Sequence, residues 1–420
     1  MDFLRKLLDL AHEQVKPGAD YEDLYPLYEA QDTGLYTPGT VTKVASHVRD
    51  FLDQKRMMGT VILALMPLVI FAMYNTGYQT ALAVGHGAVA HDGWQTLIYE
   101  NVLGLGYDAA NIGQNLVLGA LYYLPISIVT LAVGGVIEAA FAIVRKHEIN
   151  EGFLVTWFLF SLILPPTIPL WQVGLGIGFG VLFGKEVFGG VGMNVLNPAL
   201  TARAFLFFAY PAAISGDQVW TAAVDAGGVD GWTGATLLGQ AALDGVAALP
   251  DSRWMDAFVG LIPGSMGETS ALLCIVGALV LVITRIGSWK TMAGVVAGTT
   301  LMSVVLNAIG SDTNPMFSVP VYWHMVLGGW AFGTVFMATD PVSSAFTDVG
   351  KLIYGLGIGV LVVLVRVVNP AYPEGMMLAI LFMNMFAPLI DHFVVQKNVK
   401  RRQARYAATT PVKVADGGEK

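Results

Sequence analysis

The pentapeptide Gly174-Leu175-Gly176-Ile177-Gly178 recurs as Gly355-Leu356-Gly357-Ile358-Gly359, and the tripeptide Asn-Pro-Ala follows each copy, at residues 197–199 and 369–371. Each copy lies in the fourth of five apolar segments in its half of the chain. Because five is an odd number, the two halves would cross a membrane in opposite directions, as the inverted repeats of many transporters do. The alternative is a chance recurrence, since glycine and proline are frequent in membrane helices.

The composition is that of a membrane protein. Hydrophobic residues make up 55% of the 420 residues, charged residues make up 13%, and the mean hydropathy is +0.61, whereas soluble domains carry about 25% charged residues. The net charge of −8 by itself says little about nucleic acid, and we expect no nucleic-acid partner. The single cysteine, Cys274, excludes disulfides within the chain, iron–sulfur clusters held wholly by its own thiolates and four-cysteine zinc sites.

Apolar segments of about spanning length follow a charged N-terminal arm. The ten segments are 57–75, 115–144, 152–165, 168–184, 199–214, 270–285, 291–309, 321–338, 352–368 and 375–393. Several fall short of the roughly 20 residues that a perpendicular span needs, so we expect some tilted or broken helices. We predict an all-α polytopic membrane protein with about ten transmembrane helices in two inverted five-helix repeats, as in urea and ammonium channels. The predicted parts are an N-terminal arm (1–56), a first repeat (57–214), a loop (215–269), a second repeat (270–395) and a basic tail (396–420).

The distribution of basic residues predicts the orientation in the membrane. With the N-terminus in the cytoplasm, no Lys or Arg falls in the first outer loop, 75–114, and only Arg253 falls in the loop 215–269. Lys185, the turn Arg145-Lys146-His147 and the basic tail then fall on the cytoplasmic side. Both termini are therefore predicted to be cytoplasmic and the loop 215–269 periplasmic. The N-terminal arm contains no apolar stretch typical of a cleavable signal peptide.

The loop 215–269 contains the stretch Asp230-Gly231-Trp232-Thr233-Gly234-Ala235-Thr236. A long loop between apolar segments is a candidate functional site. Two small residues leave space around the hydroxyl of Thr236, and Trp232 offers a flat apolar surface, so a bulky planar group could dock there. The tripeptide Gly-Ala-Thr alone is a weak signal, because most of its occurrences in soluble proteins are ordinary turns.

The longer stretch resembles the flavinylation motif of respiratory-complex subunits, in which FMN is joined to a threonine hydroxyl through a phosphodiester. The usual tetrad is Ser-Gly-Ala-Thr, and Thr233 replaces its serine here. Other matching stretches are residues 36–39, 46–50, 145–148, 150–153, 184–190, 197–200, 205–211, 262–265, 338–343 and 368–375. On these stretches, which span most of the chain, the sequence resembles the family that includes the B subunits of the Na+-translocating NADH:quinone reductases.

This resemblance implies a six-subunit complex of the bacterial inner membrane that passes electrons from NADH to ubiquinone and exports Na+. The chain would carry covalent FMN on Thr236 and contribute to a riboflavin site and to the ubiquinone site. Its partners would be five other subunits, the lipid membrane and, during maturation, a flavin transferase. NADH would bind to another subunit, in agreement with the absence of a GxGxxG motif here.

Several residues are predicted to hold the flavin. They are Thr236 as the acceptor, Asp230, Trp232, Thr233, Gly234 and Ala235 around it, and Gly264 and Ser265 at the end of the loop. The stretch Gly264-Ser265-Met266-Gly267-Glu268 runs into an expected helix, and a glycine-rich turn at a helix N-terminus can receive an anionic group. A tight re-entrant turn is an equally good explanation of these glycines.

Five residues are candidates for the quinone and Na+ sites. The resemblance suggests the glycine pair Gly134 and Gly135 near the quinone, although small residues also serve helix packing. Acids inside membrane segments are rare, so Glu138, Asp391 and Asp340 are candidates for the Na+ route, with Asp340 at an expected broken helix end. The alternative is that Glu138 and Asp391 lie at the membrane interface or pair with basic residues of a partner.

Two other functions are compatible with parts of the sequence. One is the D subunit of the related Rnf ferredoxin:NAD oxidoreductase, but the arm with Tyr36-Thr37-Pro38-Gly39 and Ser46-His47-Val48-Arg49-Asp50 favours the quinone reductase. The other is a solute channel without redox activity, since inverted five-helix repeats also suit channels. A channel has no use for Thr236 in a flavinylation motif.

Overall fold

The computed structural model describes residues 2–16, 18–35, 54–146, 149, 152–224, 234–369 and 374–409. Helices dominate these residues, and the two short strands, β1 (Val89–Ala90) and β2 (Ala223–Val224), form one antiparallel pair. The α-helices are α1 (Asp2–Val15), α2 (Tyr25–Leu35), α3 (Gln54–Gly85), α4 (Trp94–Leu97), α5 (Ile112–Arg145), α6 (Gly152–Leu162), α7 (Leu170–Gly184), α8 (Pro198–Ala209), α9 (Pro211–Ile214), α10 (Leu237–Asp244), α11 (Trp254–Val259), α12 (Ala271–Ile283), α13 (Trp289–Ile309), α14 (Val321–His324), α15 (Trp330–Phe332), α16 (Asp348–Val368) and α17 (Met376–Thr409). The 3-10 helices are η1 (Glu22–Leu24), η3 (Glu186–Phe188), η4 (Gly245–Ala248), η5 (Asp251–Arg253) and η6 (Pro315–Ser318), and the π-helices are η2 (Ile98–Val102) and η7 (Gly333–Met337).

The predicted class, an all-α polytopic membrane protein, is confirmed. In the part of the chain that the structure describes, five helices are long and apolar enough to cross a membrane, and they lie in α3, α5, α13, α16 and α17. Four shorter apolar helices, at residues 152–162, 198–209, 237–248 and 271–283, accompany them. Each of the ten predicted apolar segments contains helix. That all ten cross the membrane, in two inverted repeats, stays a prediction.

Polar side chains at helix starts explain where several helices begin. An N-cap side chain accepts a backbone N–H that has no partner inside the helix. The caps are Asn111 for α5, Asn197 for α8, Ser270 for α12, Ser288 for α13 and Thr347 for α16. The Asn-Pro of the first repeated tripeptide is therefore a helix start, with Pro198 in the first turn, where its missing N–H does no harm.

The repeated pentapeptides pack in equivalent ways. The first and third glycines of each copy face the second long helix of their half: Gly174 and Gly178 face α5, and Gly355 and Gly359 face α13. The middle glycine faces the last helix of its half, which is α8 in the first half and α17 in the second. Because both copies bring two neighbouring helices close, the pentapeptide has one packing role in the two halves.

The predicted segment 321–338 is a broken helix rather than a continuous one. It contains only α14, α15 and η7, each of three to five residues. The chain turns at Gly328, whose φ of +60° favours glycine.

A buried arginine stabilises this break. Arg366, which is 0% exposed, donates from Nη1 to the carbonyl of His324 at 2.7 Å and from Nη2 to that of Leu327 at 2.9 Å. The carboxylate of Glu374 accepts the N–H of Gly329 at 2.7 Å. The backbone groups that a continuous helix would pair are thus paired by side chains, as buried polar groups require.

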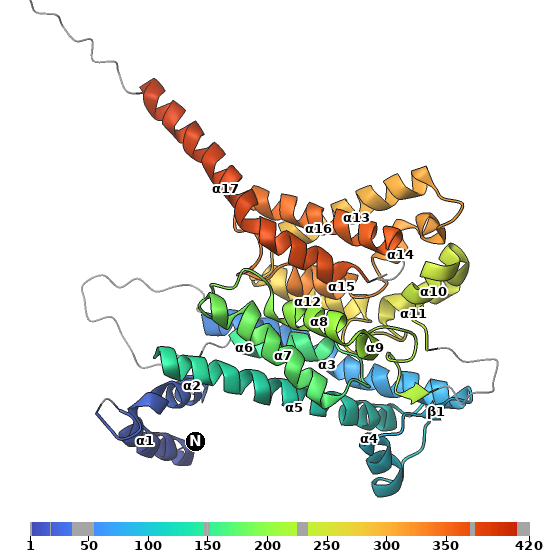
Figure 1. Cartoon of the computed structure of the whole chain (residues 1–420), viewed down its shortest axis with the longest axis horizontal. Helices are drawn as coiled ribbons and strands as arrows, with labels where there is room; N and C mark the ends of the chain where they lie inside the picture. Colours follow the sequence, from blue (N-terminus) through green and yellow to red (C-terminus); the bar gives the residue numbers. More distant parts are fainter. Residues whose placement is uncertain are drawn as a thin grey trace, which may run out of the picture.

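The predicted loop 215–269 is folded wherever the structure describes it. Its strand β2 pairs with β1 of the segment that follows α3, and α10 and α11 come after β2. In Figure 1, α10, α11 and β1 lie at one end of the molecule, opposite α1 and α2, and the last part of α17 projects away from the body.

Candidate functional site

Thr236 is the N-cap of α10. Its Oγ1 accepts the N–H of Gly239 at 3.0 Å, and Thr236 is half-buried. Gly234 is buried and Ala235 half-buried just before it. The predicted flavin residues Asp230, Trp232 and Thr233 lie outside the described residues. Because this cap uses the oxygen of Thr236 only as an acceptor, the hydroxyl hydrogen is free to be replaced by a covalent group.

A cavity of about 330 Å³ lies beside Thr236. We call it the Thr236 cavity, and its polar and aromatic wall includes Thr236, Arg203, Trp220, Gly264, Ser265 and Glu268. The structure therefore brings the predicted acceptor together with Gly264 and Ser265, which the sequence places almost thirty residues away. Ligand pockets typically measure about 300–1,000 Å³, so this cavity can enclose a planar ring system.

A buried ion pair forms one wall of the Thr236 cavity. Arg203 Nη1 lies 2.8 Å from Glu268 Oε2, and the hydroxyl of Ser265 donates to the same oxygen at 2.5 Å. Burial raises the pKa of the Glu268 carboxyl, and Glu374 adds to the rise, whereas Arg203 and Ser265 lower it. Arg203 is the cation that favours the charged form of this carboxyl.

The residues of the Thr236 cavity fit a flavin phosphate joined to Thr236. The backbone N–H groups at the start of α10 and the helix dipole favour an anion at this position. Trp220 offers an aromatic surface. The charge of Arg203 is balanced by Glu268, and Asp217 and Glu374 also line the cavity, so the start of α10 is the main attraction for the phosphate. The chemistry that FMN would supply here, when bound, is one- and two-electron transfer.

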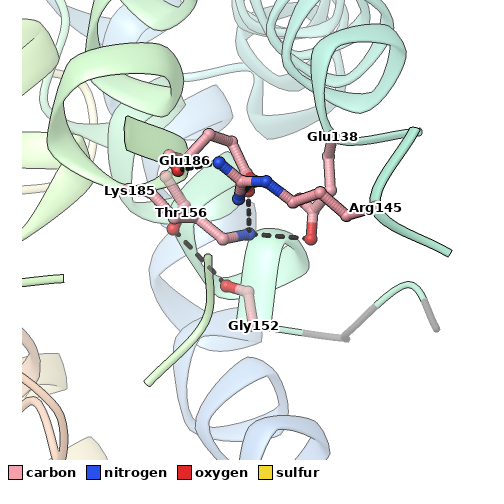
Figure 2. A network of polar contacts seen from close by, with 6 residues as sticks. All are labelled: Glu138, Arg145, Gly152, Thr156, Lys185 and Glu186. Atoms are coloured by element: carbon pink, nitrogen blue, oxygen red, sulfur yellow. Dashed lines mark hydrogen bonds and ion pairs between the residues drawn. The ribbon is translucent and has the colours of Figure 1, made fainter. Parts of the chain in front are cut away.

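The second polar site surrounds Glu138 (Figure 2). Lys185 Nζ lies 2.7 Å from Glu138 Oε1 and 3.8 Å from Glu186 Oε1. The guanidinium of Arg145 contacts Glu186 at two points. Its Nη1 lies 3.3 Å from the side-chain Oε2 of Glu186, and its Nη2 donates to the backbone carbonyl of Glu186 at 2.8 Å. Glu138, Lys185 and Glu186 are each at most 3% exposed. Glu138 thus has a cation within its own chain and is buried inside it.

Sequence reasoning missed the other members of this cluster. The prediction placed Lys185 on the cytoplasmic side, and the structure shows it only 2% exposed. It follows the end of α7 at Gly184, and Lys185 and η3 then contact α5 at Glu138 and Arg145. The adjacent charges Lys185 and Glu186 between apolar and glycine-rich stretches were the only available signal.

A small cavity of about 60 Å³ adjoins the cluster. We call it the Lys185 cavity, and its polar wall consists of Lys185, Asp340, Thr156, Asn194, Asn197 and Thr339. Asp340 lies at the end of the broken segment, as expected, and accepts the hydroxyl of Ser343 at 2.6 Å. Among the described residues, no group of three or more His, Cys, Asp or Glu side chains could hold a metal ion.

Asp391 lines neither cavity. Its carboxylate accepts the N–H of Phe346 at 2.6 Å and the N–H and hydroxyl of Thr347 at 3.0 and 2.5 Å. These bonds tie α17 to the start of α16. The structure therefore separates Asp391 from the other two predicted Na+ residues.

The glycine pair differs in packing. A Cβ on Gly134 would overlap the ring of Phe153 and lie 3.2 Å from Ile177, whereas a Cβ on Gly135 would have Phe153 as its nearest neighbour at 3.7 Å. Gly134 therefore serves close helix packing inside this chain, the alternative that the sequence left open. This packing does not test a quinone site at the pair.

Comparisons with known proteins cover nearly the whole chain. Residues 41–400 match the model of the NQR2, RnfD, RnfE family. The chain is 57% identical over 409 residues to a protein of Chromohalobacter salexigens named as the B subunit of Na(+)-translocating NADH-quinone reductase, covering 97% of this chain and 98% of that protein. It is 56% identical over 407 residues to proteins of the same name from Ectopseudomonas mendocina and Pseudomonas aeruginosa, covering 96% of this chain and 99% of each.

Proposed function

The chain belongs to the NQR2, RnfD, RnfE family, and on that premise we propose that it is a membrane subunit of a respiratory sodium pump. In this pump, electrons pass from NADH, which is oxidised in another subunit, towards ubiquinone, and Na+ is exported. The observation that carries the proposal is the 57% identity to the B subunit of a Na(+)-translocating NADH-quinone reductase over almost the full length of both chains.

Thr236 carries FMN through a phosphodiester in this proposal. Three features of the structure support it: Thr236 is half-buried at a cavity wall, its oxygen serves the helix only as an acceptor, and it lies at the positive end of α10. Arg203 and the turn at Gly264 and Ser265 would hold the phosphate or the ring. Riboflavin is a second proposed cofactor, and its pocket has no residue assigned.

The proposed topology has ten spans in two inverted five-helix repeats, with both termini in the cytoplasm and the loop 215–269 in the periplasm of a bacterial inner membrane. The equivalent packing of the two glycine pentapeptides supports the repeat. The short and broken helices fit the repeat as well, because helices interrupted within the membrane are common in inverted-repeat transporters.

Glu138, Asp340 and Asp391 form the proposed Na+ route, and Gly134 with Gly135 borders the proposed ubiquinone site. The Lys185 cavity supports a cation near the first two acids, because Asp340 lies in its wall and Lys185, another wall residue, contacts Glu138. The proposed partners are five other subunits of the complex, the lipid membrane and a flavin transferase that modifies Thr236. We propose no nucleic-acid partner.

The decisive experiment is in-gel flavin fluorescence of the denatured subunit, expressed with its flavin transferase as wild type and as Thr236→Ala. We expect a fluorescent band in the wild type and none in Thr236→Ala. Because the alanine also removes a helix cap, worth about 1 kcal/mol, Thr236→Ser is the companion variant that keeps the cap. Thr313→Ala, an exposed threonine outside the loop 215–269, is the matched control and should keep full fluorescence.

The possible results separate the three functions. Fluorescence that depends on Thr236, followed by Na+-dependent NADH:quinone activity in the assembled complex, supports the sodium pump. The same fluorescence with ferredoxin:NAD activity instead would point to an Rnf-type complex. Absence of covalent flavin in the wild type would contradict the redox function and favour a solute channel.

A further inference from the structure

Lys185 is a buried cation in direct contact with a proposed Na+ residue. It follows the last residue of α7, is 2% exposed, and packs its ammonium 5.9 Å from the centre of the Phe153 ring. Figure 2 shows it between the carboxylates of Glu138 and Glu186. A lysine so completely buried requires a charged partner.

The four charges of the cluster divide into two unequal pairs. Glu186 has its own cation, because Arg145 contacts both its side chain and its backbone carbonyl. The close contact of Lys185 is therefore Glu138, at 2.7 Å against 3.8 Å for Glu186. The ammonium makes this contact without a hydrogen bond of regular geometry. Lys185 thus contacts Glu138 with one point charge, whereas Arg145 reaches Glu186 with two nitrogen atoms.

The same lysine side chain lines the Lys185 cavity. Its other polar wall residues, Asp340, Thr156, Asn194, Asn197 and Thr339, all carry oxygen atoms, and hard cations prefer oxygen ligands. A volume of about 60 Å³ is well below the roughly 300 Å³ at which ligand pockets begin. The cavity thus suits a small ion better than a ring.

We propose that the ammonium of Lys185 is a built-in competitor of Na+ for Glu138. Without Na+, Lys185 neutralises Glu138; when Na+ enters from the Lys185 cavity, whose wall Lys185 forms, and binds Glu138, the ammonium shifts towards Glu186, which it already approaches at 3.8 Å. Glu138 then keeps a cation in both states, which avoids the large penalty of an uncompensated buried charge. Lys185 is a positioning residue that sets the apparent Na+ affinity, and its role rests on the proposed Na+ export.

The test is the Na+ dependence of NADH:quinone reduction by the purified whole complex carrying Lys185→Met. Without its competitor, Na+ should bind Glu138 more tightly, so we expect the Na+ concentration for half-maximal activity to fall about tenfold, equivalent to roughly 1.4 kcal/mol. Lys290→Met is the matched control, because Lys290 pairs with the exposed Asp348 outside the cluster, and its Na+ dependence should match that of the wild type. A half-saturating concentration that stays unchanged or rises in Lys185→Met overturns the proposal.

A second variant decides the question if Lys185→Met does not assemble. Lys185→Arg keeps the charge, and its planar guanidinium can hold a carboxylate with two hydrogen bonds, so we expect the half-saturating Na+ concentration to rise severalfold. An unchanged value in Lys185→Arg contradicts competition at Glu138. If the wild-type complex itself shows no Na+ stimulation, the proposed sodium pump fails, and that result is distinct from failure of the Lys185 proposal.

Discussion

The Thr236 cavity and the Lys185 cavity each have a buried ion pair at the wall, but the two cavities differ in volume. In each, a buried basic side chain contacts a buried glutamate: Arg203 with Glu268 at 2.8 Å, and Lys185 with Glu138 at 2.7 Å. The Thr236 cavity measures about 330 Å³ and the Lys185 cavity about 60 Å³. Helix α12 begins beside the first and ends beside the second, so the two sites lie at opposite ends of the same helix.

The larger cavity has an arginine in its ion pair and the smaller cavity has a lysine, and each side chain suits the size of its cavity. Arg203 binds both Glu268 and Ser265 with its fork of N–H groups, which fixes its position beside a cavity large enough for a ring. Lys185 contacts Glu138 with a single compact charge on a flexible stem, beside a cavity that suits one small cation. We infer that the first pair is a rigid wall and the second an exchangeable contact.

The largest effect should come from breaking the rigid pair. Arg203→Met leaves Glu268 buried without its cation, which typically costs about 3–5 kcal/mol, so we expect a clear loss of thermal stability in the purified complex. The measurement is the Tm, followed by the fluorescence of the covalent flavin. Arg253→Met, at an exposed arginine of the same loop, is the control and should leave the Tm unchanged. An unaltered Tm in Arg203→Met would show that the pair is dispensable and that the two cavities do not differ in rigidity.

A smaller change in Tm and Na+ dependence is expected at Gly134, which packs against the same Phe153 ring as Lys185. Gly134→Ala forces its Cβ against Phe153, and overpacking of this kind costs about 1–3 kcal/mol. Because the Phe153 ring flanks the Lys185 ammonium, the Na+ dependence should shift together with the Tm.

Gly135→Ala is the matched control, because its Cβ would meet Phe153 only at an ordinary 3.7 Å. We expect it to resemble the wild type in the Tm and the Na+ dependence. If both alanines instead raise the KM for ubiquinone and leave the Tm unchanged, the pair borders the quinone, and the packing argument for Gly134 fails.

Much of the fold could be predicted, because long apolar runs and the N-cap residues are local signals. The break in segment 321–338 could not be, since Gly328 and Gly329 only permit it. The arginine that satisfies the freed carbonyls, Arg366, is about forty residues further along the chain. Hydropathy is a local average, so it identifies the apolar run but contains no information about a partner that is distant in the sequence.

The candidate site was predictable in part for the same reason. The acceptor Thr236 and the turn at Gly264 could be identified from local motifs, and the structure brings them to one cavity. The pairing of Glu138 with Lys185 could not be predicted, because a charge at the end of an apolar segment is equally compatible with solvent and with burial. The path of the chain after α7 decides between these, and sequence spacing does not encode it.

The smallest change in Tm is expected at Asp391, which lines neither cavity. A variant at this position therefore tests whether the proposed cation route extends beyond the Lys185 cavity. Asp391→Asn replaces one acceptor oxygen facing Phe346 and Thr347 by a donor, which we expect to cost about 1 kcal/mol and to lower the Tm slightly. If Asp391 also belongs to the proposed route, the half-saturating Na+ concentration rises, as it should in Glu138→Gln measured beside it. A lower Tm with an unchanged Na+ dependence would limit Asp391 to holding α17 on α16, and the cation route would then depend on the Lys185 cavity without it.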